Sequence, residues 1–395
     1  MRNESRTDAD RSAEPAASSA DGETLDVLLA PDYTSSNPYQ ANLAEGLANG
    51  GATVSLGSGR GYLLPLSRLA ADEGLPDVLH LHFFTPFMIV GDERLERFGL
   101  GALVTLVLGL SLLVDLALLR LRGVVTVWTV HDLVNHERRY LRIERAVKHV
   151  AARFLFDRIV VHCATAGEEF RRAFSLPAST SEKTVVIPHG HFLDDYPNEV
   201  DRETARDHLD LPSESTVFLF FGWIRPYKNV PRLVEQFKRL DSDRARLLVV
   251  GSARSAALER TIREGSADDD RIETVLEFVP DDEVQYYMNA ADAVVLPFRT
   301  EERSLLTSGS VLLAMGFGNA VVAPAIGCIG TLLDDEGGVC YDRGATDQPL
   351  SGMRALLDAD TDAMSEHNRR TVESLDWDTI GERTHRTYQR AVAER

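Results

Sequence analysis

Short apolar runs of strand length alternate with helical patterns along this chain, and the alternation starts twice. The first series of predicted strands covers residues 25–30, 53–56, 78–81, 124–129, 158–162 and 184–187. The second series covers residues 216–221, 247–250, 273–279, 293–296 and 320–323. Strands that alternate with helices form parallel sheets with helical crossovers. The pattern therefore predicts an α/β fold of two doubly wound domains, with ligands bound beyond the carboxyl ends of the strands and between the domains.

The length of the chain supports this division. Its 395 residues, 44% of them hydrophobic, are enough for two cores. Residues 1–23 are rich in Ser, Ala, Asp, Glu and Arg and contain no apolar segment, which predicts a disordered acidic tail and not a signal peptide. The polar segment 197–213 is the predicted linker. We therefore expect the first domain at 24–196, the second at 214–375 and a closing segment at 376–395.

The charge balance narrows the class of partner. A net charge of −19 argues against nucleic acid, which binds basic surfaces. Among 42 basic residues there are four lysines, namely Lys148, Lys183, Lys228 and Lys238. An acidic surface poor in lysine keeps a protein soluble in concentrated salt, so the composition predicts a halophilic microbe.

The three cysteines carry a prediction about the compartment. Cys163, Cys328 and Cys340 have neither the spacing of metal ligands nor that of a redox pair. Stable disulfides are rare in a reducing cytoplasm. The sequence therefore predicts a cytoplasmic protein.

The loop at residues 221–229 combines a glycine with two cations. Gly222 ends a predicted buried strand, and Arg225 and Lys228 stand three positions apart before a helix pattern at residues 230–240. Unpaired amides and the helix dipole favour an anion at such a place. The loop therefore predicts a diphosphate site, and the alternative is a surface loop with two solvated cations.

The second half of the chain resembles the nucleotide-sugar domain of the family four glycosyltransferases (glycosyl transferases group 1). These enzymes have the GT-B architecture of two facing Rossmann-like domains. The segments that carry the resemblance are residues 222–228, 278–282, 290–297, 313–323 and 377–388. In the first half, residues 128–132 and 187–190 are similar to the acceptor-side loops of this group. The resemblance spans roughly residues 24–393.

The resemblance implies the transfer of a hexose from a nucleotide-diphosphate sugar to a hydroxyl acceptor. At the donor, the candidate residues in the segments that carry the resemblance are Gly222, Arg225, Lys228, Val279 and His189. Ser308, Gly309 and Ser310 are further donor candidates, although they stand where the chain departs from the family. On the acceptor side or at the diphosphate loop, the candidates are Asn37, Tyr39 and His82. The helix at 376–395 would pack back on the first domain.

The chain departs from the family in the last donor loop. Enzymes of this group usually carry two Glu there, eight positions apart, and the matching residues are Leu305 and Leu313. Ser308 at the predicted helix N-terminus has the character of an N-cap, and Gly309 would let a ligand approach the backbone. With Ser310, these residues either bind a sugar or phosphate in place of the Glu pair or only cap the helix.

His131 is the best candidate for chemistry. It follows the strand at 124–129, on the side of the sheet where ligands bind. Imidazole can take a proton from a hydroxyl or hold a sugar by hydrogen bonds near neutral pH, and in the resembling family a His at this place contacts the donor sugar. The alternative is a loop histidine with satisfied hydrogen bonds. Asp132 is the candidate base if the reaction inverts configuration.

Three further histidines are candidates by their position. His80 and His82 point to the same face of a strand because they are two positions apart. His82 is nearer the carboxyl end and is the better candidate to reach the cleft, although both could simply pack. His189, in a Pro-His-Gly turn, is a candidate to touch the sugar or the diphosphate.

No metal or cofactor is expected. No His or carboxylate pair has helical i, i+4 spacing with a third ligand in view. Arg225 and Lys228 can neutralise the charge that a divalent ion neutralises in other transferases.

Residues 98–119 carry a single charge, Asp115, and are long enough to cross a bilayer. However, the strands at 78–81 and 124–129 on either side are expected in one sheet, which excludes a spanning helix. Two readings stay open: a buried crossover helix, or a helix that lies in the membrane interface. The second reading suits a lipid-linked acceptor.

The sequence thus predicts a metal-independent glycosyltransferase. The expected partners are a nucleotide-diphosphate sugar and a saccharide or lipid-linked acceptor, at the cytoplasmic face of the cell membrane. A nucleotide-sugar epimerase is one alternative, although its acid–base carboxylates are not found. A catalytically silent homologue that binds a sugar nucleotide or a partner enzyme is the other, because the Glu pair is absent.

Overall fold

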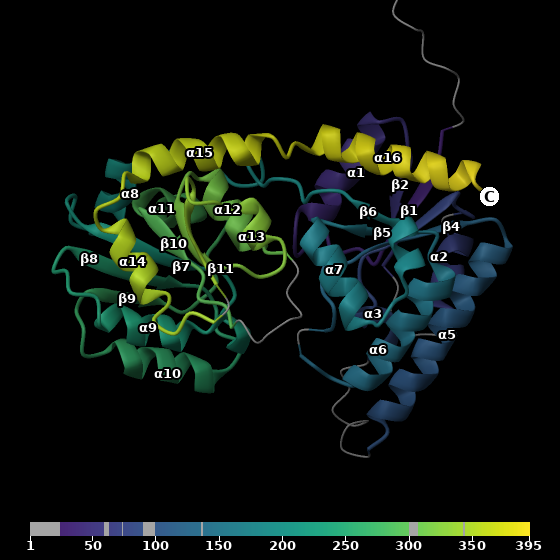
Figure 1. Cartoon of the computed structure of the whole chain (residues 1–395), viewed down its shortest axis with the longest axis horizontal. Coiled ribbons are helices and arrows are strands. Elements are labelled where there is room, and N and C mark those ends of the chain that lie inside the picture. Colours follow the sequence, from purple (N-terminus) through teal and green to yellow (C-terminus); the bar gives the residue numbers. More distant parts are fainter. Residues whose placement is uncertain are drawn as a thin grey trace, which may run out of the picture.

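The computed structural model describes residues 24–58, 63–72, 74–89, 99–135, 137–299, 307–342 and 344–395. The predicted acidic tail, Phe98 and Leu305 lie outside these residues. The chain forms two α/β domains side by side, and the C-terminal helices run along the same side of both (Figure 1). The predicted architecture of two doubly wound domains is confirmed.

The first domain is built on a six-stranded sheet whose neighbouring strands are all parallel, in the order β2-β1-β3-β4-β5-β6. Its strands are β1 (Asp26–Ala30), β2 (Thr53–Leu56), β3 (Val78–Leu81), β4 (Val125–Thr129), β5 (Arg158–Val161) and β6 (Thr184–Val186). Its helices are α1 (Tyr39–Asn49), α2 (Pro65–Asp72), α3 (Thr85–Met88), α5 (Gly101–Leu121), α6 (Leu141–Val150), η1 (Ala151–Leu155), α7 (Ala164–Ala173) and η2 (Ala178–Lys183). The order in which successive strands are added to the sheet switches sides between β1 and β3, and such switch points are where these sheets bind ligands.

The second domain has a six-stranded parallel sheet in the order β12-β11-β10-β7-β8-β9. Its strands are β7 (Thr216–Phe221), β8 (Ala245–Val250), β9 (Ile272–Val275), β10 (Ala293–Val295), β11 (Ala320–Pro324) and β12 (Gly338–Tyr341). Its helices are α8 (Arg202–His208), η3 (Pro226–Lys228), α9 (Val230–Lys238), α10 (Ala256–Ser266), α11 (Val284–Ala290), α12 (Gly309–Gly316), α13 (Ile329–Leu332), α14 (Leu350–Leu356) and α15 (Thr361–Glu373). The switch point lies between β7 and β10.

Three local predictions differ from the structure. The strand predicted over 273–279 ends at Val275, because the chain leaves the sheet there and Phe278 is exposed. The edge strand β12 follows a short polar and glycine-rich stretch and was not predicted. The segment 197–213 contains α8, which packs on α11, and the buried Arg206 of α8 pairs with Asp292 of the second domain at 2.8 Å.

Helix α16 (Trp377–Ala393) crosses back to the first domain, as predicted (Figure 1). It packs closely on α1, since a Cβ atom at Gly46 would lie 2.2 Å from the carbonyl oxygen of Trp377. Its Tyr388 is fully buried and makes a 2.6 Å hydrogen bond to Nδ1 of His80. The last helix therefore belongs to the first domain's core.

Helix α5 covers one side of the first sheet. Among the described residues, α5 is the one helix that is long enough and apolar enough to cross a bilayer, by length and composition alone. The strands before and after it, β3 and β4, pair in the same sheet, as predicted, so it is a crossover helix. Asp115 lies on its buried side and accepts hydrogen bonds from the amides of Leu66 and Ser67 at 2.6 and 3.0 Å. The carboxyl group of Asp115 therefore caps the N-terminus of α2.

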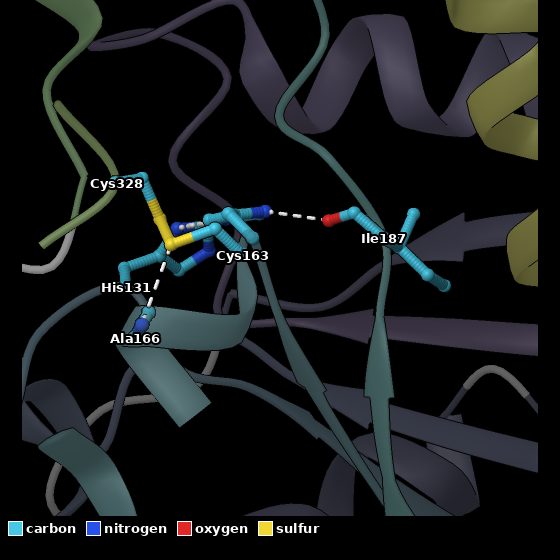
Figure 2. The surroundings of a disulfide bond; sticks show 6 residues. His131, Cys163, Ala166, Ile187 and Cys328 are labelled. Carbon is cyan, nitrogen blue, oxygen red and sulfur yellow. Dashed lines mark hydrogen bonds between the residues drawn. A yellow bond between two sulfur atoms is a disulfide. The ribbon is translucent and has the colours of Figure 1, made fainter. Parts of the chain in front are cut away.

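The prediction that the cysteines form no redox pair is wrong. Cys163 and Cys328 form a disulfide, with Cα atoms 5.6 Å apart (Figure 2). Cys163 precedes α7 in the first domain and Cys328 precedes α13 in the second, so the bond joins the two domains. The two residues are 165 positions apart, and such a pairing depends on the tertiary fold and leaves no pattern in the local sequence. Cys340 is not bridged.

Candidate functional site

A cavity of about 440 Å³ opens at the carboxyl ends of the first sheet. Its walls come from the loops after β1, β3, β4 and β6, together with Arg225 of the second domain. The predicted site residues that line it are Asn37, Tyr39, His82, His131, Asp132, His189 and Arg225. The fold therefore brings the first-domain candidates and Arg225 of the second domain to one place.

The loop after β4 carries His131 and Asp132, and buried polar groups brace it. Glu144 of α6 accepts hydrogen bonds from the amide and side chain of Asn135, at 2.9 and 2.6 Å. Lys148 pairs with Glu144 at 2.8 Å and donates to the carbonyl of Leu133 at 3.1 Å. Buried charges of this kind are stable only when paired and hydrogen-bonded. The pair therefore holds the loop in position.

His131 is half-buried in the cavity wall, and both of its ring nitrogens have partners. Nε2 lies 3.1 Å from Nδ1 of His82, and Nδ1 lies 3.4 Å from Nε2 of His162. Its ring stacks on Phe83, with centroids 4.8 Å apart. Burial, and next the positive charge that His162 would carry, hold the pKa of His131 well below its usual value. The ring is therefore neutral at pH 7.

Tyr39 lies at the centre of this group of imidazoles. Its ring centroid is 4.8 Å from that of His131 and 4.7 Å from that of His189. Burial raises the pKa of its hydroxyl, so Tyr39 stays protonated. Its position behind the histidines makes it a supporting residue of the cavity wall.

The two strand histidines behave differently. His80 is buried, with hydrogen-bond partners on both nitrogens, Tyr388 at 2.6 Å and Thr129 at 2.7 Å. His82 lines the cavity, and its buried Nε2 has no hydrogen-bond partner among the described residues. Burial lowers the pKa of both rings. His80 is therefore a packing residue, whereas His82 belongs to the site.

A second group of candidates lies at the switch point of the other domain. Gly222 has a φ angle of +108°, and a Cβ atom there would lie 3.4 Å from Nζ of Lys228 and 3.8 Å from Oγ of Ser310. Lys228 is buried, and this burial, with the neighbouring charge of Arg225, lowers the pKa of its ammonium to about 8. An ammonium that is destabilised in this way gains most from a bound anion.

The start of α12 completes this group. Ser308 is the N-cap residue, but its side chain makes no capping hydrogen bond, so the reading in which these residues only cap the helix loses its support at this position. Gly309 lies against Phe192, to which a Cβ atom would come within 3.2 Å. Ser310 of the first turn stands beside Gly222, and the N-terminus of a helix favours an anion.

Some candidates are not part of these two groups. Val279 is partly buried against the core of the second domain and does not line the cavity. Leu305 of the predicted donor loop, together with the neighbouring Glu301 and Glu302, lies outside the described residues. Within the described part of the chain, no three His, Cys, Asp or Glu side chains are arranged to hold a metal ion.

The sequence interpretation missed two features of the site. His162 ends the predicted strand 158–162 and could have been chosen by the rule that selected His131, because both follow neighbouring strands on the ligand side. Glu137 of the cavity wall pairs with Arg254 of the second domain. No local pattern indicates this contact, since it depends on how the domains face each other.

Residues 215–359 match the family model described as glycosyl transferases group 1. The chain is 28% identical to a GDP-mannose:glycolipid 4-beta-D-mannosyltransferase of Xanthomonas campestris pv. campestris, over 80% of the chain and 81% of the relative. It is also 28% identical to a D-inositol 3-phosphate glycosyltransferase of Geodermatophilus obscurus, over 60% of the chain and 53% of that relative.

Solved structures share the fold. A sucrose-phosphate synthase from Thermosynechococcus elongatus has a TM-score of 0.70 at 17% identity and covers 94% of this chain and 100% of its own. The Anabaena protein HepE, in complex with UDP and glucose, has a TM-score of 0.62 at 15% identity, over 93% of this chain and 100% of its own. At these identities the similarity concerns the fold alone.

Proposed function

Because the chain is a glycosyltransferase of the GT-B fold with a group 1 domain at residues 215–359, we propose that it transfers mannose from GDP-mannose to a hydroxyl group of a glycolipid. The observation that carries this proposal is the pairing of two half-sites. The half-buried His131 lines a cavity in the first domain, and Arg225 of the cationic loop lines the same cavity from the second. An acceptor in one domain and a donor in the other would meet between them.

The donor diphosphate is proposed to lie over Gly222. The absence of a side chain at Gly222, the buried ammonium of Lys228 and the hydroxyl of Ser310 support this position. Arg225 adds a second cation. As the bond between the sugar C1 and the diphosphate breaks, negative charge collects on the leaving phosphate oxygen. Fixed cations and amides then stabilise that charge without a metal ion.

His131 is proposed to act at the reacting centre. The acceptor oxygen forms the new bond to C1, and its proton must leave during this step. A neutral imidazole can take that proton at Nε2 or hold a sugar hydroxyl by a hydrogen bond. The depressed pKa of His131 supports the neutral form. Asp132, which also lines the cavity, is the alternative base.

A glycolipid acceptor is supported by the cavity and by helix α5. The cavity wall includes apolar and aromatic side chains, among them Phe83, Ile89 and Val134. The relative of this chain from Xanthomonas is named for a glycolipid acceptor. One face of α5 exposes a row of apolar side chains: Leu103, Leu106, Val107, Leu110 and Val114. An exposed apolar row of this size is unusual on a soluble monomer.

We propose that this row lies in the interface of a membrane rich in anionic lipid. Helix α6 and the following η1 run beside α5, since Gly109 of α5 faces Val147 of α6 and Arg120 of α5 donates to the carbonyl of Leu155 in η1. Together α6 and η1 expose Arg142, Arg145 and Arg153, next to the exposed Phe154. Cations beside an apolar row suit anionic headgroups. In a chain of net charge −19, this local excess of Arg favours a lipid partner.

The cellular setting is proposed from composition. The acidic surface with four lysines suits concentrated salt. The cytoplasmic face of the membrane is proposed from the sugar-nucleotide donor alone, because the disulfide between Cys163 and Cys328 removes the support that the cysteines gave to a reducing compartment. A halophilic protein should keep its fold in molar KCl and unfold as the salt is diluted. Thermal unfolding at graded KCl concentrations tests this, and a midpoint that does not rise with salt would contradict it.

Nucleotide release tests the proposed activity. We expect the purified protein to release GDP from GDP-mannose when a lipid extract is added, and to add a hexose to a lipid that mass spectrometry detects. UDP-glucose is the control donor. If GDP-mannose binds but no extract tested causes GDP release, the result would favour the catalytically silent homologue. That alternative is considered because Leu313 stands where the family usually has a Glu. Conversion of the free donor to an isomer would favour an epimerase.

A further inference from the structure

Three histidines of the site form a connected row of hydrogen bonds that starts at a main-chain carbonyl. The carbonyl oxygen of Ile187 lies 3.0 Å from Nδ1 of His162. Nε2 of His162 lies 3.4 Å from Nδ1 of His131, whose Nε2 lies 3.1 Å from Nδ1 of His82. In Figure 2 the dashed lines that end at Ile187 and at His131 mark the first two contacts.

The carbonyl decides which nitrogens carry protons along the whole row. A carbonyl only accepts, so Nδ1 of His162 must be the donor to Ile187. Burial lowers the pKa of His162 to about 4, so its ring is neutral and its Nε2 carries no proton. The contact between His162 and His131 therefore requires the proton on Nδ1 of His131. Because the His131 ring is also neutral, its Nε2 carries no proton and accepts a hydrogen bond from Nδ1–H of His82.

We propose that His162 is a positioning residue that fixes His131 in the tautomer protonated at Nδ1, so that its basic Nε2 is the nitrogen available to a hydroxyl group of the substrate. This role rests on the proposed function of His131 for its consequence in catalysis. The assignment of the tautomer itself follows from the carbonyl and from the neutral state of the buried His162, and it does not depend on any activity.

The arrangement also prepares His131 to carry a charge. When Nε2 of His131 takes a proton, the positive charge spreads to Nδ1–H, which still donates to His162. An acceptor behind a catalytic imidazole stabilises the imidazolium and keeps the ring in position, as a carboxylate does in other enzymes. A neutral imidazole gives weaker stabilisation than a carboxylate, so it offsets less of the burial that lowers the pKa of His131.

His82 completes the row on the substrate side. In the structure it donates to Nε2 of His131, so a ligand hydroxyl has to share or replace this hydrogen bond. Nε2 of His82 is a bare acceptor, buried and without a partner among the described residues. A buried unsatisfied acceptor costs about 1–3 kcal/mol, so the row is better satisfied when a ligand donates a hydrogen bond to it.

Long-range ¹H–¹⁵N correlation spectra of histidine-labelled protein test the assignment directly, since the two neutral tautomers give different ring-nitrogen shifts. His131→Gln removes one set of signals and so assigns the ring. We expect His131 to be protonated at Nδ1 in the parent. Protonation at Nε2 in the parent would overturn the proposal without any further variant.

Two substitutions separate positioning from packing. Gln at position 162 can place an amide oxygen near the site of Nε2 and accept from His131, whereas Leu cannot. We expect His162→Gln to keep the tautomer and most of kcat. We expect His162→Leu to mix the tautomers and lower kcat by about 10- to 100-fold, by analogy with the range for residues that orient metal-binding histidines. Donor affinity should not change in either variant.

The matched control is His149→Gln. His149 also faces a main-chain carbonyl with Nδ1, that of Phe174 at 2.6 Å, but it lies outside the site. It should leave the His131 signals and kcat unchanged. A parental tautomer in folded His162→Leu would overturn the proposal. If the parent has the expected tautomer but no transferase activity with any donor, the proposed function fails while the assignment stands.

Discussion

Cys163 and Cys328 join the two domains by a disulfide, although 165 positions separate them in the sequence. Cys163 directly follows His162, which contacts His131. The Sγ atom of Cys163 accepts a hydrogen bond from the amide of Ala166 at 3.3 Å (Figure 2). The covalent link between the domains is therefore anchored next to the proposed catalytic histidine. It limits how far the proposed donor and acceptor half-sites can separate.

Reduction of this disulfide should destabilise the chain. A crosslink that closes a loop of this length contributes up to about 5 kcal/mol by restricting the unfolded state. We expect Cys163→Ser to lower the midpoint of thermal unfolding in calorimetry and added dithiothreitol to have little further effect on that variant. Cys340→Ser is the matched control, because this thiol is not bridged. Three reactive thiols in the unfolded, unreduced protein would show that the disulfide does not form.

The cationic loop should supply much of the donor affinity. A hydrogen bond to a charged group contributes about 1.5–3 kcal/mol, so Arg225→Ala and Lys228→Ala should each weaken GDP-mannose binding by about 10- to 150-fold. Titration calorimetry measures this. Lys238→Ala, which removes a lysine paired with Asp268, should bind like the parent. Parental affinity in the Arg225→Ala, Lys228→Ala double variant would disprove the diphosphate site.

Donor binding should depend on pH through Lys228. Its pKa is lowered to about 8, and the diphosphate prefers the charged ammonium. Affinity should therefore be full below pH 7 and fall as the pH rises through 8, by up to about tenfold per pH unit. In Lys228→Arg this loss should disappear, because guanidinium keeps its proton in that range. The same slope in both proteins would assign the titration to another group.

His131 should matter for turnover more than for nucleotide binding. Proton transfer by a positioned side chain is worth about 100- to 10,000-fold in rate. We expect His131→Ala to lose kcat by that order, while circular dichroism and GDP affinity stay parental. His80→Asn is the contrasting variant, because His80 is buried and lies outside the cavity wall. We expect it to lower the free energy of unfolding more than it lowers kcat. Near-parental turnover of a folded His131→Ala variant would return His131 to a structural role.

The apolar row of α5 should attach the protein to lipid. Leu106 and Leu110 are 42% and 53% exposed, so Asp at both positions should leave the fold intact and weaken flotation with anionic vesicles. Leu112, which is fully buried on the same helix, is the contrasting position, where Asp should unfold the domain. Chelators should not release the bound protein. A parent that never floats with vesicles would rule out the interfacial helix.

Local sequence was sufficient for the elements and for part of the site. Apolar period and breaker residues lie within a few positions of each other, so the strands other than the edge strand β12, the crossover helices and the glycine–cation loop at 221–229 could be predicted from local sequence. The position of His131 also followed, because the end of a parallel strand is a defined place in the fold. The packing of the last helix on the first domain came from the resemblance.

The remaining features depend on residues that are distant in sequence. The disulfide, the contact of Glu137 with Arg254, and the row from Ile187 through His162 to His131 each join different loops. No local period records such pairings, since they arise when crossovers stack strands side by side and bring two domains face to face. The sequence determined which side chains stand at strand ends, and the tertiary structure decided which of them meet and which nitrogen of His131 holds the proton.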